Sequence, residues 1–505
     1  MNAVLSWFAT NGGKIDSASV GFTEFDGAGR GAVALRDIPE GHVLFKIPRS
    51  LILSTTTSAL PRRVGLEQWR ARGMHRGWAG LILCVMWETA NGAASRWAPY
   101  LESLPSTFDT PMFWSEEDLE ELRGTSVVEK LGKADAEKDF SEKVLPLVQS
   151  RPDIFPPETI PSFYTLEVYH IMGSRILSRS FDVERDEEEG EADVGNTSSG
   201  SAMDVDEPHA PEQEDGEGSS EDGEAEDEDE DDSIVVSMVP LADMLNARYE
   251  CENAKLFYEK DSLGMMSTKP IKTGEQIWNT YGDLPNAELL RRYGHVDLVP
   301  LNESTDASTS DPSANPSALG NPGDVVEIRA DLVLSVLDLP PQSEAKTKER
   351  IDWWLEQGGD DVLILDSDHT IPPALISLIR LLQLDDADWA KTVEKDKPPK
   401  PKLDAESMGV VIRVLERRLG EYPTTVDTDI ALLLQTTNTE LSLNKKHALA
   451  VRIGEKRILE RTLEDARARV VAAAVAASSG NGKKRKAGEE LEAERNTRTK
   501  TQRKR

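Results

Sequence analysis

A long acidic segment divides this chain and constrains its fold more than any other feature. Residues 182–232 include 25 acidic side chains and a single basic one, Arg185. Such a segment has almost no apolar surface to bury, so we expect it to form a disordered loop. Helical sequence precedes it and strand-like sequence follows it. We therefore expect the loop to lie within a folded domain.

The loop also accounts for most of the acidity of the chain. The formal net charge over 505 residues is -33, and the loop contributes -24 of it. The rest of the chain is much closer to electrical balance. The overall acidity therefore neither indicates nor excludes a basic groove for duplex DNA. We expect no direct contact with nucleic acid.

Cysteine and histidine usage gives no support for a metal centre. The two cysteines, Cys84 and Cys251, cannot build a disulfide framework or an all-cysteine zinc cluster. The seven histidines show no HxxxH spacing. The longest apolar stretch, residues 79–87, is far too short to cross a bilayer, and the N-terminus lacks the basic region of a signal peptide. We expect a soluble intracellular protein with no bound metal and no contact with a membrane.

Hydrophobic periodicity divides the remaining sequence. Short apolar runs between Gly and Pro residues predict strands over residues 20–53 and again after residue 233. A helical period predicts helices over residues 60–180, one of them capped by Ser115, and over residues 326–476. The pattern predicts an α+β fold. The expected units are a β-rich domain over 1–300 with a helical insert at about 60–180, a linker over 301–325, a helical domain over 326–476 and a basic disordered tail over 480–505.

Three short motifs could carry chemistry, although each alone has a purely structural explanation. The glycines of GAGRG at 27–31 suit either an ordinary hairpin or a close backbone approach to a ligand, because a strand follows them and not a helix. The ADMLN run at 242–246 follows a strand and could be an Asx turn. The Tyr-Gly pairs at 281–282 and 293–294 could be core aromatics with glycine caps.

Taken together, the order and spacing of these motifs resemble the SET-domain protein lysine methyltransferases, and most closely the Rubisco large-subunit methyltransferase-like branch. The shared pattern is GAG followed by RDIPEGHVL, then ADMLN, then NTYG and RRYG. Residues 239–259 look most like the fungal ribosomal lysine methyltransferases and their animal relatives. The resemblance implies a β-rich SET fold split by a helical insert and followed by an all-α C-terminal substrate-binding domain.

The resemblance also implies the residues of the site. The implied cofactor is S-adenosylmethionine, and seven residues match the family's cofactor-binding positions: Ala28, Gly29, Arg30, Arg179, Asn246, Ala247 and Tyr293. Asp243 is expected to contact the substrate near its lysine, and Tyr281 is the implied catalytic tyrosine. Two residues depart from the family's pattern. Ala247 stands where a His is common, and His295 stands where a Phe is common.

The implied activity is S-adenosylmethionine-dependent methylation of lysine in a basic protein. A ribosomal protein of the large subunit is the expected target, and a histone is another candidate. Two alternatives stay open: a non-catalytic SET scaffold that binds basic nuclear proteins, and a histidine methyltransferase of the same branch. We expect a monomer. The basic runs KKRK at 483–486 and RKR at 503–505 predict residence in the nucleus, with a cytoplasmic pool.

Overall fold

The computed structural model describes most of the chain. The described residues are 1–25, 29–184, 234–301, 319–337, 344–434 and 441–502. The acidic loop from residue 185 onward lies outside them, as does Ala28 of the GAG motif. Within the described part, no helix is both long and apolar enough to cross a membrane.

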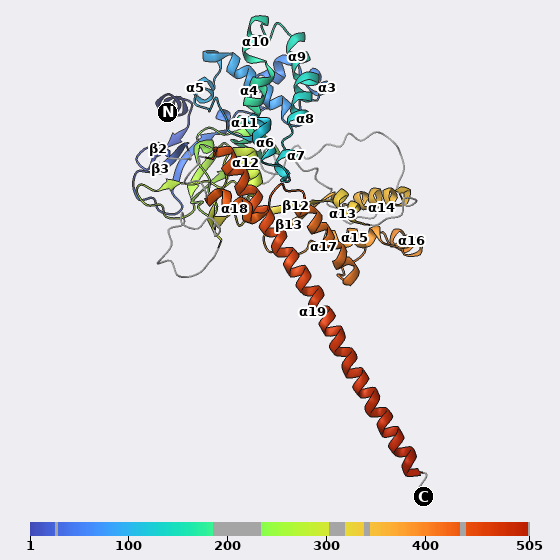
Figure 1. Ribbon diagram of the computed structural model, residues 1–505. Coiled ribbons are helices and arrows are strands. Elements are labelled where there is room, and N and C mark those ends of the chain that lie inside the picture. Colours follow the sequence, from blue (N-terminus) through green and yellow to red (C-terminus); the bar gives the residue numbers. More distant parts are fainter. Residues whose placement is uncertain (26–28, 185–233, 302–318, 338–343, 435–440, 503–505) are drawn as a thin grey trace.

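Antiparallel strands from both sides of the acidic loop build the first domain (Figure 1). Four strands pair in the order β1-β4-β8-β7, three in the order β2-β3-β9, and β5 pairs with β6. The strands are β1 (Lys14–Ile15), β2 (Val20–Phe25), β3 (Gly29–Ala34), β4 (Val43–Pro48), β5 (Ser180–Glu184), β6 (Ile234–Met238), β7 (Ala254–Tyr258), β8 (Ser262–Ser267) and β9 (Gln276–Ile277). Strands far apart in sequence are therefore neighbours in space.

Helices between β4 and β5 form the insert, which lies at the top of Figure 1. Residue Ser115 accepts a hydrogen bond from the backbone N–H of Asp118, so the predicted N-cap is confirmed. The N-terminal helix α1 (Asn2–Thr10) is followed by α2 (Leu60–Val64), α3 (Leu66–Ala71), α4 (Ala79–Ala90), α5 (Ala98–Leu101), α6 (Glu116–Glu120), α7 (Ser126–Glu129), α8 (Lys133–Asp139), α9 (Leu145–Ser150), α10 (Ile160–Phe163) and α11 (Leu166–Leu177). Short helical turns join them: η1 (Arg49–Leu51), η2 (Gly92–Ala94), η3 (Pro111–Phe113), η4 (Phe140–Val144) and η5 (Pro157–Thr159).

Two predicted elements near the insert differ from the structure. The strand expected at residues 51–53 is reduced to a single bridge between Leu53 and Met238, because η1 occupies its start. The predicted acidic loop begins too early, since Asp182 belongs to β5 and pairs with Val236 of β6. The alternation of apolar and polar residues in Ser180–Glu184 suits a strand with one buried face.

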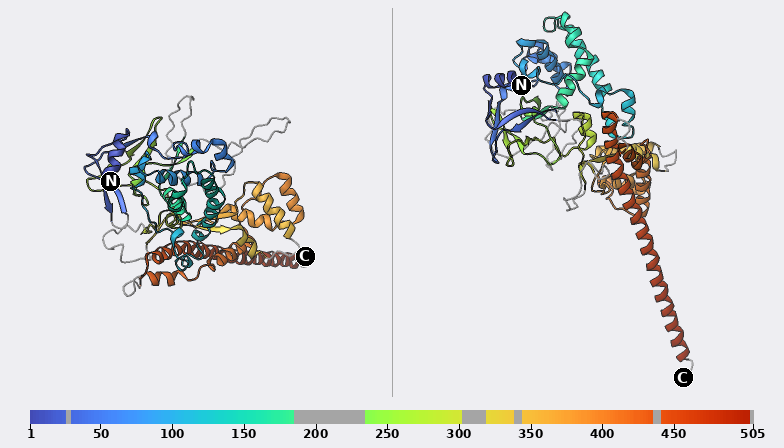
Figure 2. Two further views of the ribbon diagram at one scale, coloured as in Figure 1. Left: turned by 90° about the horizontal axis from the view of Figure 1, so that it is seen from above. Right: turned by 60° about the vertical axis from the view of Figure 1, so that its left-hand side comes forward.

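The C-terminal domain is mainly helical and packs beside the first domain (Figure 2). Its helices are α13 (Ala330–Val336), α14 (Glu344–Glu356), α15 (Pro373–Leu382), α16 (Asp386–Lys395), α17 (Ala405–Leu419), α18 (Val426–Leu434) and α19 (Leu443–Gln502). Before it come η6 (Ala242–Met244), α12 (Asn286–Tyr293) and the pair β10 (Val299–Pro300) and β11 (Leu319–Gly320). The residues directly before the predicted linker thus pair with Leu319 and Gly320 in its second part.

The all-α prediction for the C-terminal domain is wrong in one respect. Strands β12 (Val325–Arg329) and β13 (Val362–Asp366) pair over their full lengths and bury alternate residues, among them Val326 and Leu365. In both segments every second residue is buried, the period of a half-buried strand. The helical sequence on either side of these short segments led to the prediction of helices alone.

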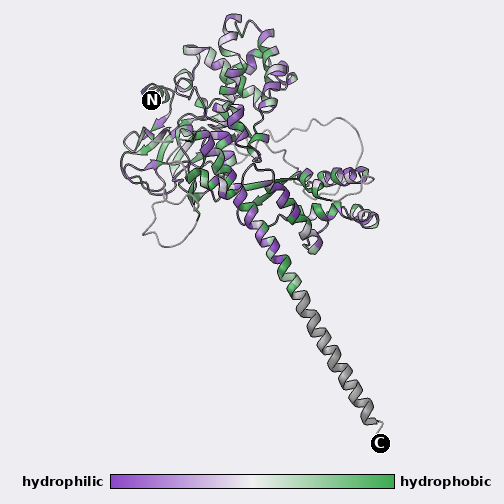
Figure 3. Ribbon diagram, in the orientation of Figure 1, coloured by the Kyte–Doolittle hydropathy of each residue, from purple (hydrophilic) through white to green (hydrophobic). Residues whose placement is uncertain are grey.

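Helix α19 is longer than the sequence predicts. Its backbone stays helical to Gln502, through most of the tail expected to be disordered from residue 480. Residues 443–505 contain no proline and are rich in good helix formers, so the backbone continues as a helix through Gly480 and Gly482, two residues that favour a helix end. Side chains as far as Ala466 are buried against the domain, whereas Val470, Val471 and Val475 are exposed. A short hydrophobic stretch of α19, green in Figure 3, lies where the helix leaves the domain.

Among the described residues, three clusters of buried hydrophobic side chains hold the molecule together. The first fills the space between the strands and the insert, and the second lies within the C-terminal domain. The third joins three regions: Trp114, Leu122 and Val127 of the insert, Leu290 of α12 and Val451 of α19. Helix α12 therefore packs between the insert and α19. The α+β class predicted from the sequence is confirmed.

Candidate active site

The ADMLN and NTYG motifs meet at the backbone. Asn279 donates its backbone N–H to the carbonyl oxygen of Asn246 at 2.9 Å, and Ala247 pairs with Asn279 in a parallel bridge. The turn before the ADMLN motif contains Leu241, whose φ of 71° is unusual for a residue other than glycine. This contact brings together two segments that lie 33 positions apart in the sequence.

Asp243 lies buried at the start of this junction, with 7% of its surface exposed. Its backbone carbonyl oxygen accepts a hydrogen bond from Arg179 Nη1 at 2.6 Å, and its Oδ2 accepts one from the Tyr100 hydroxyl at 2.7 Å. Burial raises the pKa of Asp243 to about 6, although Arg179 and the Tyr100 hydrogen bond oppose the rise. The carboxyl group is thus largely ionised at neutral pH.

Tyr281 and Tyr293 stack face to face beside this carboxylate. Their ring centroids are 4.0 Å apart and the planes differ by 5°. Burial raises the pKa of Tyr281. Of the nearby charges, Arg179 acts to lower this pKa and Asp243 acts to raise it. The hydroxyl therefore stays protonated at neutral pH and can donate a hydrogen bond. Below, the tyrosine cluster means Tyr281, Tyr293, Arg179 and Asp243.

Glycine makes room beside Asn246. A Cβ atom on Gly31 would lie 2.7 Å from Asn246 Nδ2 and 2.6 Å from Gln276 Nε2, so only glycine fits without a shift. Both amide nitrogens are buried, and neither has a hydrogen-bond partner among the described residues. Buried N–H donors without partners are rare in folded proteins.

The remaining predicted residues lie less centrally. Gly29 begins β3 with a φ of 65°, and Arg30 directs its guanidinium to Glu24, with Nε 3.5 Å from the carboxylate. The Arg30 side chain therefore does not face the tyrosine cluster, and any ligand contact would come from its backbone. His295 lies 6.0 Å from Tyr293, ring centre to ring centre, and burial lowers its pKa. A neutral imidazole therefore occupies this position.

The unpartnered donors fit the implied cofactor. S-adenosylmethionine carries a carboxylate and an adenine ring, both of which accept hydrogen bonds. Asn246 Nδ2 and Arg179 Nε are buried donors whose partners are missing from the described part of the chain. A ligand acceptor would remove the cost of leaving these groups unpaired. Asp243 Oδ1, an acceptor, is also buried and unpartnered among the described residues, and it suits a cationic ligand.

A very small cavity of about 10 Å³ lies beside Tyr281. Its walls come from the ADMLN–NTYG junction and from α12: Ala247, Arg248, Tyr249, Tyr281, Gly282, Leu284, Leu289 and Asp297. An aromatic wall with a buried carboxylate nearby favours a cation such as a lysine ammonium. Tyr281 is the one member of the tyrosine cluster that lines this cavity, so the cavity marks an opening beside the candidate catalytic residue.

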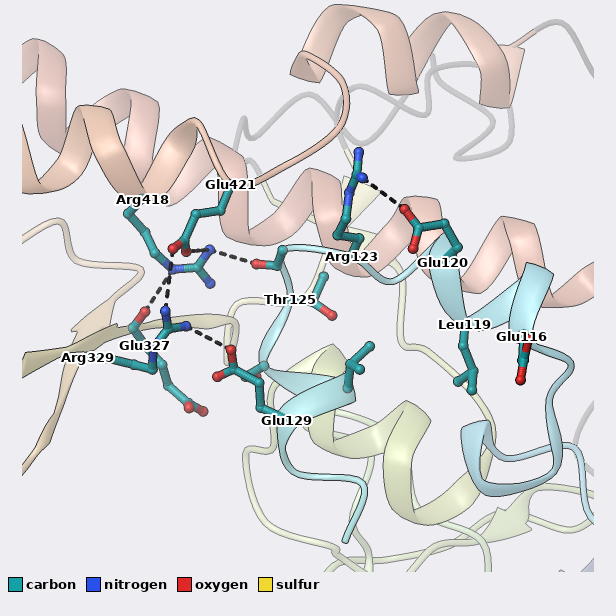
Figure 4. Close-up of a pocket in the computed structure, with 13 residues that line it drawn as sticks. Glu116, Leu119, Glu120, Arg123, Thr125, Glu129, Glu327, Arg329, Arg418 and Glu421 are labelled. Atoms are coloured by element: carbon teal, nitrogen blue, oxygen red, sulfur yellow. Dashed lines mark hydrogen bonds and ion pairs between the residues drawn. The ribbon is translucent and has the colours of Figure 1, made fainter. Parts of the chain in front are cut away.

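A larger cavity of about 550 Å³ lies away from this centre, between α6 and α7 of the insert and β12 and α17 of the C-terminal domain (Figure 4). Its charged side chains pair with one another across the domain boundary. Arg329 contacts Glu129 at 2.8 Å, and Arg418 donates to the carbonyl oxygen of Gly124 at 2.6 Å. We interpret it as an ion-paired seam between the two domains.

Three residues of the site escaped prediction. Gly31 belongs to the GAGRG motif, but the resemblance assigned the cofactor contact to Gly29 and not to Gly31. Gln276 and Tyr100 carry no local signal, because only the fold brings them to Asn246 and Asp243.

Comparisons with known proteins agree with this geometry. A SET domain model matches residues 29–282, and a Rubisco LSMT substrate-binding model matches residues 334–459. The chain is 33% identical to "Ribosomal lysine N-methyltransferase 4" of Saccharomyces cerevisiae over 276 residues, which span 54% of this chain and 50% of the yeast protein. It is 28% identical to "N-lysine methyltransferase SETD6" of Homo sapiens over 86% of this chain and 84% of the human protein.

Solved structures show the same fold. A structure of "the SET domain of LSMT bound to Lysine and AdoHcy" superposes with a TM-score of 0.62 at 19% identity, covering 93% of this chain and 91% of that chain. "Structure of Rubisco LSMT bound to AdoMet" gives a TM-score of 0.60 at 18% identity, covering 93% and 92% of the two chains. The motifs, their convergence on Tyr281 and the match over half of the chain establish that this protein belongs to the SET-domain family.

Proposed function

We propose that this protein, an S-adenosylmethionine-dependent protein-lysine N-methyltransferase, acts on a ribosomal protein of the large subunit. The observation that carries the activity is the tyrosine cluster: a protonated Tyr281 hydroxyl beside a buried carboxylate and unpartnered donors. The ribosomal substrate is supported by the similarity to the yeast ribosomal lysine N-methyltransferase.

The chain's own residues would act by positioning. S-adenosylmethionine supplies a methyl group on a positively charged sulfur, so the reaction needs a neutral amine held in line with it. The Tyr281 ring would form one wall of the lysine site, and Asp243 supplies negative charge that acts on Tyr281. Tyr293, stacked on the Tyr281 ring, remains a proposed cofactor contact. The Tyr281 hydroxyl can orient the amine. Burial of the lysine lowers its pKa and favours the neutral nucleophile.

The proposed sites of cofactor contact follow from the same geometry. Asn246 and Arg179 offer buried donors, and Gly31 leaves the space beside Asn246 open. The backbones of Gly29, Arg30 and Ala247 remain proposed contacts.

The substrate can be tested with ribosomes from cells that lack the gene. Large and small subunits would be incubated separately with the purified protein and isotopically labelled S-adenosylmethionine, and methylated residues would be located by tandem mass spectrometry. We expect label on a lysine of a large-subunit protein. Label confined to the small subunit or to added core histones would contradict the ribosomal proposal, and label on a histidine would support the alternative residue specificity.

We also propose that the protein resides in the nucleus. Support comes from the KKRK and RKR runs near the end of the chain, a spacing read by import receptors. A fluorescently tagged protein that lacks residues 482–505 should shift to the cytoplasm. Unchanged nuclear accumulation would show that these runs are not the import signal.

A further inference from the structure

Tyr100 links the helical insert to the reacting centre. It lies in α5, is completely buried, and donates its hydroxyl hydrogen to Asp243 Oδ2 at 2.7 Å. The two residues are 143 positions apart in the sequence. None of the motifs that define the site includes Tyr100, so its contact with Asp243 is a product of the fold alone.

The Tyr100 ring is held rigidly. It stacks on Trp7 of α1 with a centroid separation of 6.2 Å and an interplanar angle of 12°. Trp7 is fixed in turn, because its Nε1 donates to the carbonyl oxygen of Arg96 at 2.6 Å. Rigid packing of this kind fixes the direction of the phenol hydroxyl, as a positioning contact requires.

The contact leaves one carboxylate oxygen of Asp243 available. Oδ2 is occupied by Tyr100, whereas Oδ1 is buried without a hydrogen-bond partner among the described residues. Three charged or titratable side chains surround this pair. The positive charges of Arg175 and Arg179 act to lower the pKa of Tyr100, and the negative charge of Asp243 acts to raise the pKa of Tyr281. A buried and unpaired oxygen on a carboxylate whose charge acts on Tyr281 is suited to receive a cationic substrate group.

We infer that Tyr100 is a positioning residue: its hydroxyl holds the Asp243 carboxylate ionised and turned so that Oδ1 faces the substrate lysine beside Tyr281. Tyr100 itself touches neither substrate nor cofactor in this arrangement. The insert thus contributes to the reaction through one hydrogen bond. The inference rests on the proposed role of the tyrosine cluster.

The acid–base properties of Asp243 make the inference testable. Burial raises the pKa of Asp243, and the Tyr100 hydrogen bond is one of the contacts that oppose the rise. Loss of that hydrogen bond should therefore raise the pKa further. Asp243 would then be protonated in a larger fraction of molecules near neutral pH, and protonation removes the charge that attracts a lysine ammonium.

The test compares Tyr100→Phe with the unchanged full-length protein and with Tyr422→Phe. The control removes the same kind of contact, because the buried Tyr422 hydroxyl donates to the carboxylate of Glu455 in the C-terminal domain. kcat and KM for methylation of large ribosomal subunits would be measured from about pH 6 to about pH 9. For Tyr100→Phe we expect the acid limb of kcat/KM to move up by about one pH unit, mainly through KM, with recovery to within about twofold at the alkaline end.

A purely structural role would lower activity equally at every pH, and that result would overturn the inference. A second readout needs no substrate: the carboxyl carbon of Asp243, labelled with ¹³C and assigned with Asp243→Asn, would be titrated by NMR in both proteins. We expect it to titrate at higher pH in Tyr100→Phe. An unchanged titration would overturn the inference even if ribosomal subunits prove not to be the substrate, and their failure to accept methyl groups would count against the proposed substrate alone.

Discussion

At the scale of single residues, the motifs predicted most of the site but not the contacts that orient it. Asn246 contacts Asn279 of the NTYG motif, and Arg179 reaches the Asp243 carbonyl oxygen, while the roles of these residues stay predictions. Sequence spacing could not reveal Tyr100, because a contact across 143 positions leaves no local pattern. The role of Ala28 stays a prediction, since it lies outside the described residues.

Substitution of Gly31 tests the cofactor cradle. The added methyl group of Gly31→Ala would press on the unpartnered amide nitrogens of Asn246 and Gln276, both less than 3 Å away. We expect the affinity for S-adenosylmethionine to fall by about tenfold in a calorimetric titration, equivalent to about 1.4 kcal/mol. Gly264→Ala in β8 is the matched control, because its Cβ would find nothing closer than Glu259 Oε1 at 3.8 Å. Equal affinities in the two variants would show that this glycine does not border the cofactor.

At the scale of secondary structure, helix α12 sets the position of Tyr293. Glu288 pairs with Arg291 at 2.8 Å and with Arg292 at 2.7 Å, and all three side chains are largely buried. Gly294, with a φ of 77°, ends the helix directly after Tyr293. The sequence predicted this helix and its glycine cap. It could not predict β12 and β13, because short strands inside helical sequence depend on tertiary pairing.

Loss of the Glu288 charge should destabilise α12. Burial alone would raise the pKa of Glu288, but attraction to Arg291 and Arg292 outweighs it and lowers the pKa to about 2. Glu288→Gln leaves the two buried guanidinium groups without this carboxylate, at a cost of about 3 kcal/mol. The variant should therefore unfold at a clearly lower urea concentration than the unchanged protein. Glu120→Gln is the control, since its exposed pair with Arg123 should contribute no more than about 0.5 kcal/mol. Similar unfolding midpoints for both variants would refute the role of Glu288.

At the scale of the whole molecule, α19 ties the C-terminal domain to the rest through buried polar side chains. Glu455 accepts a hydrogen bond from Tyr422 and lies 3.5 Å from Arg418, whose Nη1 also reaches the Gly124 carbonyl oxygen in the insert. The amphipathic pattern predicted that α19 would pack as a helix. It could not predict a buried carboxylate, because the partners of Glu455 come from other parts of the chain.

The buried carboxyl group of Glu455 should make stability depend on pH. Burial raises its pKa from 4.5 to about 8, although Arg418 opposes the rise. Between these two values the folded state holds a proton that the unfolded state has lost, so stability should fall as pH rises through this window. Glu455→Gln removes this proton and should flatten the decline in melting temperature between about pH 6 and about pH 8.

The matched control for this prediction is Glu416→Gln, whose carboxylate forms an exposed pair with Arg467. It should keep the slope of the unchanged protein. An equally steep decline in Glu455→Gln would show that Glu455 is not the titrating group. Some slope should persist in any case, because burial also raises the pKa of Asp324, to about 7.

The most direct test of the site is Tyr281→Phe, assayed for both cofactor binding and methyl transfer on the same preparation. The hydroxyl is expected at the reacting amine, whereas the ring stack with Tyr293 survives the change. Tyr258→Phe, which removes a hydroxyl that donates to the Asp182 carbonyl oxygen, is the control. We predict that Tyr281→Phe binds S-adenosylmethionine within about threefold of the unchanged protein but transfers methyl groups to large ribosomal subunits or core histones at least about 100-fold more slowly. Methyl transfer at the unchanged rate would contradict the assignment of Tyr281 as the catalytic residue.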